Sequence, residues 1–160
     1  DVATGQLLWT ATEGEGERMP DFALSPDGGL LALGNRRGNE IRLLEPATGQ
    51  ERAILKDGHQ GGVEQVAFSQ DGTLLASAGQ DRTVRLWDMA SHTLLPFKGV
   101  LPSQPAQLCF SPDGRLVGVR MADERVRTVR EAVGPDVDVM IDVVNRLALD
   151  RFYLPPGPSM

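Results

Sequence analysis

The stretch that decides the fold runs from Gly58 to Asp88 and reads GHQGGVEQVAFSQDGTLLASAGQDRTVRLWD. It holds three short apolar segments, at residues 63–68, 74–76 and 83–87, separated by turn-forming sequences. The first separator contains Asp71-Gly72, a dipeptide that favours a tight hairpin turn. Two hairpins in succession predict a three-stranded antiparallel sheet, which is too small to be stable alone. We therefore expect further sheets to pack against this one.

The same unit recurs along the chain. Ser-Pro-Asp-Gly or Ser-Gln-Asp-Gly stands at 25–28, 69–72 and 111–114, so successive copies are 44 and 42 residues apart. The segment 41–45 likewise precedes its counterpart 84–88 by 43 residues, and residues 1–6 match residues 45–50. A period of 40–45 residues with a Gly-His start and a Trp-Asp end is typical of the blades of a β-propeller.

These residues resemble the WD-repeat β-propeller family over about residues 1–130. The resemblance implies a mainly β fold: a partial, open β-propeller of about three four-stranded blades, with a C-terminal α/β-like tail. The first residue falls where a blade normally closes, so we expect a fragment of a longer protein. The expected parts are the outer strand of a preceding blade at 6–11, blade one at 20–56, blade two at 58–98, blade three at 106–130, and a divergent tail at 131–160 with a disordered end at 151–160.

The resemblance also implies a structural tetrad in blade two, formed by His59, Ser77, Asp81 and Trp87. In such a tetrad the aspartate binds the histidine, the histidine binds the serine, and the serine binds the indole N–H. The same residue types could form a Ser–His–Asp nucleophile. However, Ser77 lies inside an expected strand and not in the G-x-S-x-G turn that exposes a nucleophile. We therefore expect a structural network and no catalytic residue.

The tail favours a different structure from the blades. Apolar residues at helical spacing predict a helix over 122–133, and a continuous apolar run predicts a strand over 137–144 of the kind buried in a parallel sheet. Residues 123–129 also align with 81–87, which would make them a strand of blade three. Residues 123–146 resemble the helix–strand unit of the enolase superfamily, whose members bind a divalent metal through carboxylates. Asp142 would match the first metal ligand, but Val144 replaces the usual Asn of that family.

Charge and cysteine content exclude some classes of function. The net charge of −6 leaves no basic excess for binding nucleic acid or an anionic membrane. Cys109 is the only cysteine and lies in an apolar segment, so we expect a buried free thiol and a reducing, cytoplasmic location. No cofactor and no metal site are expected.

Together these patterns predict a non-catalytic protein–protein interaction scaffold. The resemblance implies that protein partners bind the loops at the blade ends. Because the terminal blades would each expose an apolar face, self-association through open blade faces is also expected. The alternative is a piece of a metal-dependent enzyme of the enolase type, represented by the tail alone, or an artificial or natural fusion of the two.

Overall fold

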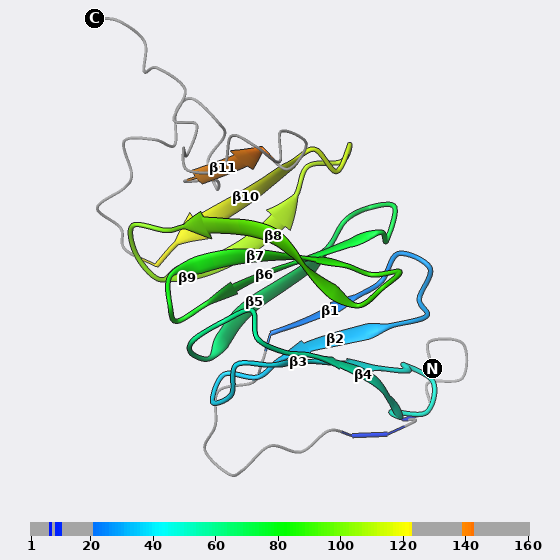
Figure 1. Ribbon diagram of the computed structural model, residues 1–160. Coiled ribbons are helices and arrows are strands. Elements are labelled where there is room, and N and C mark those ends of the chain that lie inside the picture. The colour runs from blue at the N-terminus through cyan, green and yellow to red at the C-terminus, as the bar shows by residue number, and fades with distance from the viewer. Residues whose placement is uncertain (1–6, 8, 11–20, 123–138, 143–160) are drawn as a thin grey trace, which may run out of the picture.

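The computed structural model describes residues 7, 9–10, 21–122 and 139–142. In these residues the chain forms three antiparallel sheets that stack face to face in the order of the sequence (Figure 1). We name them sheet one, sheet two and sheet three. Within the described ranges, no helix is long and apolar enough to cross a membrane. The prediction of a mainly β chain built from four-stranded antiparallel sheets is confirmed for the first two sheets.

Sheet one contains four consecutive strands joined by short turns. They are β1 (Phe22–Leu24), β2 (Leu31–Gly34), β3 (Ile41–Leu44) and β4 (Glu51–Leu55). Each strand pairs with the next, so β1 lies at one edge and β4 at the other. Half-buried and buried residues alternate along β2, and in β3 the exposed Arg42 lies between the buried Ile41 and Leu43, as the two-residue period of a strand predicts.

Sheet two repeats this arrangement with longer strands. They are β5 (Val63–Phe68), β6 (Leu74–Gly79), β7 (Thr83–Asp88) and β8 (Thr93–Val100). The recurring turn at 25–28, 69–72 and 111–114 joins the first two strands of each sheet. In sheet two, the hydroxyl of Ser69 donates to Asp71, whose carboxylate also accepts the backbone N–H of Thr73. The expectation that these recurring aspartates form turns therefore agrees with their contacts.

Sheet three has three described strands, β9 (Pro105–Phe110), β10 (Leu116–Met121) and β11 (Val139–Asp142). The strand β11 pairs antiparallel with β10. It occupies the position in sheet three that β3 occupies beside β2 in sheet one. The strand predicted over 137–144 is therefore present at 139–142, but it belongs to an antiparallel sheet, so the expectation of a parallel sheet is wrong. The predicted helix over 122–133 and the alternative strand over 123–129 lie outside the described residues, apart from position 122.

Two apolar clusters hold the stack together, one at each interface between sheets. Between sheets one and two, Ile41 and Leu43 pack against Val66 and Trp87. Between sheets two and three, small residues of β6 such as Ala76 pack with Val117 and Val119 of β10. Sheet two is therefore buried on both faces, which accounts for the mostly buried residues of its central strands.

The expected burial of Cys109 is wrong, because its side chain is exposed. Its neighbour Leu108 is 7% exposed and belongs to the cluster between sheets two and three. Successive side chains of a strand point to opposite faces. Cys109 therefore lies on the face of β9 that is turned away from sheet two.

Candidate functional site

The structure joins His59, Ser77, Asp81 and Trp87 by hydrogen bonds inside sheet two. Nδ1 of His59 lies 3.1 Å from Oδ1 of Asp81, and Nε2 lies 2.8 Å from Oγ of Ser77. The indole N–H of Trp87 donates to the same Oγ at 2.9 Å. His59 lies before β5, while Ser77 is on β6, Asp81 follows β6 and Trp87 is on β7. The network therefore connects three segments of one sheet.

One protonation pattern satisfies every bond of this network. The indole of Trp87 can only donate, so Oγ of Ser77 accepts from it and gives its own proton to Nε2 of His59. Nδ1–H of His59 then donates to Asp81, and the ring is neutral. Burial lowers the pKa of His59, and although the carboxylate of Asp81 opposes this effect, the net shift is downward. The histidine is therefore neutral at pH 7.

The network does not resemble an accessible nucleophile. Ser77 is 0% exposed and Trp87 is 1% exposed, so the hydroxyl is closed off from solvent on the face turned to sheet one. In sheet one the position of Ser77 is occupied by Leu33, and in sheet three by Val119. A substrate could reach Ser77 only if the sheets separated.

Sequence reasoning missed Thr83 as a member of this network. Its hydroxyl donates to Oδ1 of Asp81 at 2.9 Å and lies 3.3 Å from Nδ1 of His59. Asp81 also accepts the backbone N–H groups of Gln60 and Thr83. Burial raises the pKa of Asp81, but these hydrogen bonds outweigh it and the pKa is lowered overall. A threonine two residues after an aspartate in a turn is a signal that could have identified it.

A second polar cluster, which the sequence did not indicate, bridges sheets one and two at one end. Arg36, in the β2–β3 turn, forms an ion pair with Glu64 at the start of β5. The side-chain amide of Gln80, in the β6–β7 turn, donates to Oε1 of Glu64 at 2.8 Å and to the carbonyl oxygen of Arg36 at 3.2 Å. Gln104, which precedes β9, makes the corresponding contact between sheets three and two. Its side-chain amide donates to the carbonyl oxygen of Gln80 at 3.1 Å. The turns at this end therefore support one another across both interfaces.

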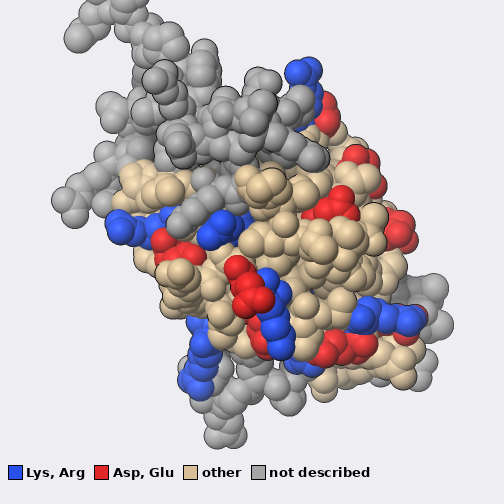
Figure 2. Space-filling model, viewed as in Figure 1, with Lys and Arg blue, Asp and Glu red and all other residues tan. Residues whose placement is uncertain are grey.

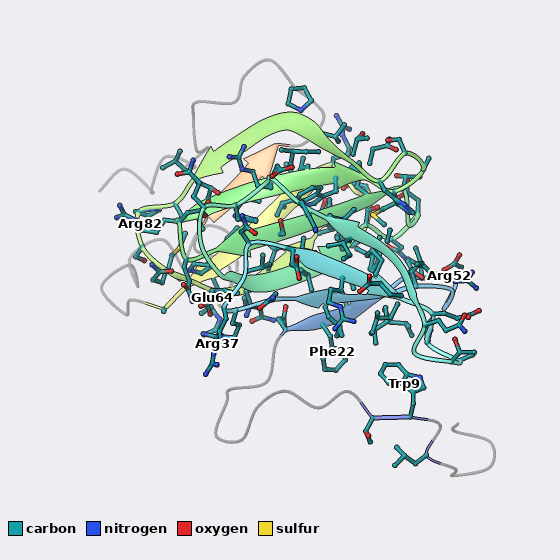
Figure 3. The ribbon with its side chains drawn as sticks, turned by 60° about the horizontal axis from the view of Figure 1, so that its bottom comes forward. Trp9, Phe22, Arg37, Arg52, Glu64 and Arg82 are labelled. Carbon is teal, nitrogen blue, oxygen red and sulfur yellow. The ribbon has the colours of Figure 1, made fainter. Side chains whose placement is uncertain are left out.

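Figure 3 shows where four charged side chains of the turns and strand ends lie. Arg37, Glu64 and Arg82 lie at one end of the sheets, and Arg52 lies at the opposite end. On the face shown in Figure 2, basic and acidic side chains are intermixed and do not form a patch of one sign. Arg52 and Glu45 form an ion pair at 2.8 Å.

The other sequence candidates are not brought together. Asp142 ends β11, where its backbone lies opposite Leu116. His92 lies in the β7–β8 turn and is exposed. Among the residues that the structure describes, no group of three His, Cys, Asp or Glu side chains could hold a metal ion.

Trp9 makes a specific contact outside the sheets. Its indole N–H donates to the carbonyl oxygen of Pro46 at 2.6 Å. The ring covers Gly49, which has a φ of 71° and no space for a side chain beneath the indole. The described residues at positions 7, 9 and 10 are not in a strand, and the outer strand predicted over 6–11 stays a prediction.

Comparisons with known proteins agree with the repeat pattern. Residues 49–88 match the WD40 family, described as "WD domain, G-beta repeat". The chain is 37% identical over 102 residues to the Periodic tryptophan protein 2 homolog of Schizosaccharomyces pombe, covering 64% of this chain and 12% of that protein. It is 34% identical over 129 residues to the Pre-mRNA-processing factor 19 homolog 2 of Arabidopsis thaliana, covering 79% of this chain and 23% of that protein. The chain therefore spans less than a quarter of the length of either relative.

A solved structure shows the same fold at low sequence identity. The Hydrazine Synthase of Kuenenia stuttgartiensis superposes with a TM-score of 0.59 and 19% identity, covering 73% of this chain and 33% of that chain. Nothing in these comparisons supports the resemblance of residues 123–146 to the enolase superfamily. The chain carries a WD40 repeat within stacked antiparallel sheets, and its relatives are WD-repeat proteins.

Proposed function

We propose that this chain is part of a non-catalytic scaffold that binds other proteins through the turns at the ends of its sheets. The observation that carries the proposal is the complete burial of Ser77, the one serine that is hydrogen-bonded to a histidine within the described residues. A hydroxyl that is 0% exposed and shared between a histidine and an indole stabilises a sheet and does not meet a substrate. The exposed turns are then the parts that remain available for binding.

The arrangement of the sheets supports the finer proposal of an open propeller fragment with three blades. The strand order within each sheet and the stacking of sheets one, two and three follow the period of the sequence. The contact between Trp9 and Pro46 supports the outer strand predicted over 6–11, because Met89, the counterpart of Pro46 in sheet two, shares an apolar cluster with Ala53 of β4. By the repeat spacing, Ala53 is the counterpart of Trp9.

The proposal extends to location. A free, exposed thiol at Cys109 is compatible with a reducing compartment, and we propose the cytoplasm.

Charge reversals at the two ends of the sheets would test the scaffold function. The variants Arg37→Glu and Arg82→Glu alter one end, and Arg52→Glu alters the other end. We expect a bound protein, identified by mass spectrometry after capture on the immobilised chain, to be lost from the variants at one end only. Thermal melts of all three variants serve as the folding control.

Two results would contradict the proposal. The first is a set of captured proteins that is the same for all three variants. The second is a hydrolytic activity of the purified chain that disappears in Ser77→Ala. A magnesium site detected by calorimetry and lost in Asp142→Asn would instead favour the metal-dependent alternative, for which no described contact gives support.

A further inference from the structure

One face of sheet one has no described sheet packed against it, and its edge strand β1 presents large apolar side chains there. By the strand register Arg42 and Leu44 of β3 lie on the same face, and Leu44 is 3% exposed. We call the face of a sheet that is turned toward the preceding sheet its front face, and the opposite face its back face. Phe22 and Leu24 lie on the front face of sheet one and are 64% and 54% exposed. Figure 3 shows Phe22 pointing away from the stacked sheets.

The repeat spacing shows what this position does in the other two sheets. Phe22 stands three residues before Ser25, as Val66 stands before Ser69 and Leu108 before Ser111. Val66 is 5% exposed and Leu108 is 7% exposed, because each packs against the preceding sheet. Phe22 therefore stands at a position that is buried between sheets in the other two repeats, but no described sheet covers it.

The surface that fits such a front face is a back face with small side chains. At both interfaces within the chain, the back face contributes alanines two residues before and seven residues after the repeat serine. These are Ala23 and Ala32 in sheet one, and Ala67 and Ala76 in sheet two. Small residues at these positions leave room for the larger residues of the next front face.

The back face of sheet three keeps this pattern of small residues. The equivalent positions are Cys109, which is exposed, and Gly118. Arg120 is the exception, because it stands where sheet two has Ala78, and its Nε donates to Oε1 of Gln107 at 3.3 Å. Among the described residues, therefore, no sheet covers Phe22 and Leu24 at one end of the stack, and none covers Cys109 at the other.

We propose that the front face of sheet one binds the back face of sheet three in a second copy of this chain. The contact continues the interfaces between sheets one and two and between sheets two and three, and it is heterologous, since two different faces meet. It rests on the proposed function as an interaction module and specifies one partner for it. Phe22 and Leu24 lie on the first copy, and Cys109 becomes covered on the second.

Sedimentation velocity and the reactivity of Cys109 test the proposal together. We expect the full chain to associate as its concentration rises through the micromolar range, and the reaction of Cys109 with Ellman's reagent to slow over the same range. Phe22→Asp and Leu24→Asp should each weaken association about tenfold or more, since each removes a large apolar side chain from the interface. Both residues are exposed within one chain, so these variants should keep the melting temperature that the wild type has at concentrations too low for association.

Two further variants make the experiment specific. Val100→Asp changes an equally exposed apolar residue, 55% exposed, on β8, and it should leave association unchanged. Arg120→Ala restores the small residue found in sheet two and should strengthen association.

Three outcomes would overturn the proposal: a monomer at every concentration, association that survives Phe22→Asp, or association during which Cys109 stays fully reactive. The third would indicate that two front faces meet. A monomer that still captures a protein through its turns would overturn this inference and leave the scaffold function standing.

Discussion

Asp21 and Val66 are joined across the interface between sheets one and two, although 45 residues separate them in the chain. Oδ2 of Asp21 accepts the backbone N–H of Val66 at 2.8 Å. Sheets two and three have glutamine at the equivalent positions, Gln65 and Gln107. Sheet one therefore uses a half-buried carboxylate where the other repeats have a neutral amide.

Neutralising this carboxylate should stabilise the protein at neutral pH. Burial raises the pKa of Asp21, and the hydrogen bond from Val66 and the charge of Arg36 offset only part of this effect. A raised pKa in the folded state contributes stability that is present at low pH and is lost as pH rises through that pKa. We expect Asp21→Asn to unfold at a higher urea concentration than the wild type at pH 7, and at the same concentration near pH 3.

Asp81→Asn is a control for which the expected change in stability at pH 7 has the opposite sign. The pKa of Asp81 is lowered overall, so its ionised form stabilises the folded state above the unfolded pKa, and that stability is lost as pH falls. This variant should be less stable than the wild type at pH 7. A lower stability of Asp21→Asn at pH 7 would show that the charge of Asp21 is favourable at the interface.

The two tryptophans should differ strongly in their contribution to stability. Trp87 is 1% exposed and bonded to Ser77, so Trp87→Ala should cost about 3–5 kcal/mol, as truncation of a buried aromatic residue does. Trp9 lies at the surface of the β3–β4 turn with one hydrogen bond, and Trp9→Ala should cost about 1 kcal/mol. Urea unfolding of the two variants provides the comparison. If both variants lost the same free energy of unfolding, Trp87 would contribute no more to the core than Trp9 does.

The protein should lose stability when His59 takes up a proton. Because burial lowers the pKa of His59, the neutral ring contributes stability that is present above the unfolded pKa of about 6.5 and is lost as pH falls toward the folded pKa. We expect the melting temperature of the wild type to fall between pH 7.5 and pH 5. His59→Gln should melt lower at pH 7.5 but change less over this range. Parallel pH curves for the two proteins would exclude His59 as the titrating group.

The strands can be predicted from the sequence because each repeat carries its own signals. Short apolar segments separated by turn-forming sequences are sufficient to locate β5, β6 and β7, and the tetrad residues follow from the family resemblance. The contacts of Asp21 and Arg36 could not be predicted, since they depend on how sheets one and two stack. The prediction for Cys109 was wrong because its apolar neighbours do not reveal which face of β9 is covered.

The close approach of sheets one and two at Gly62 gives the last prediction. Gly62 is buried, and a methyl group at this position would overlap the carbonyl oxygen of Arg36, which is backbone and has little freedom to move. Gly62→Ala should therefore push the β2–β3 turn away and cost about 1–3 kcal/mol, as overpacking in a core does.

Hydrogen exchange would locate the damage, because the N–H groups of Val63 and Val66 donate to Asn35 and Asp21 of sheet one at 2.8 Å each. Both should exchange faster in Gly62→Ala, while amides bonded within sheet two keep their rates. The neighbouring variant Gly61→Ala is the control, since the nearest atom to its methyl group would be in the side chain of Gln80, at 3.3 Å. If both variants exchange alike, the contact between Gly62 and Arg36 does not limit the approach of the two sheets.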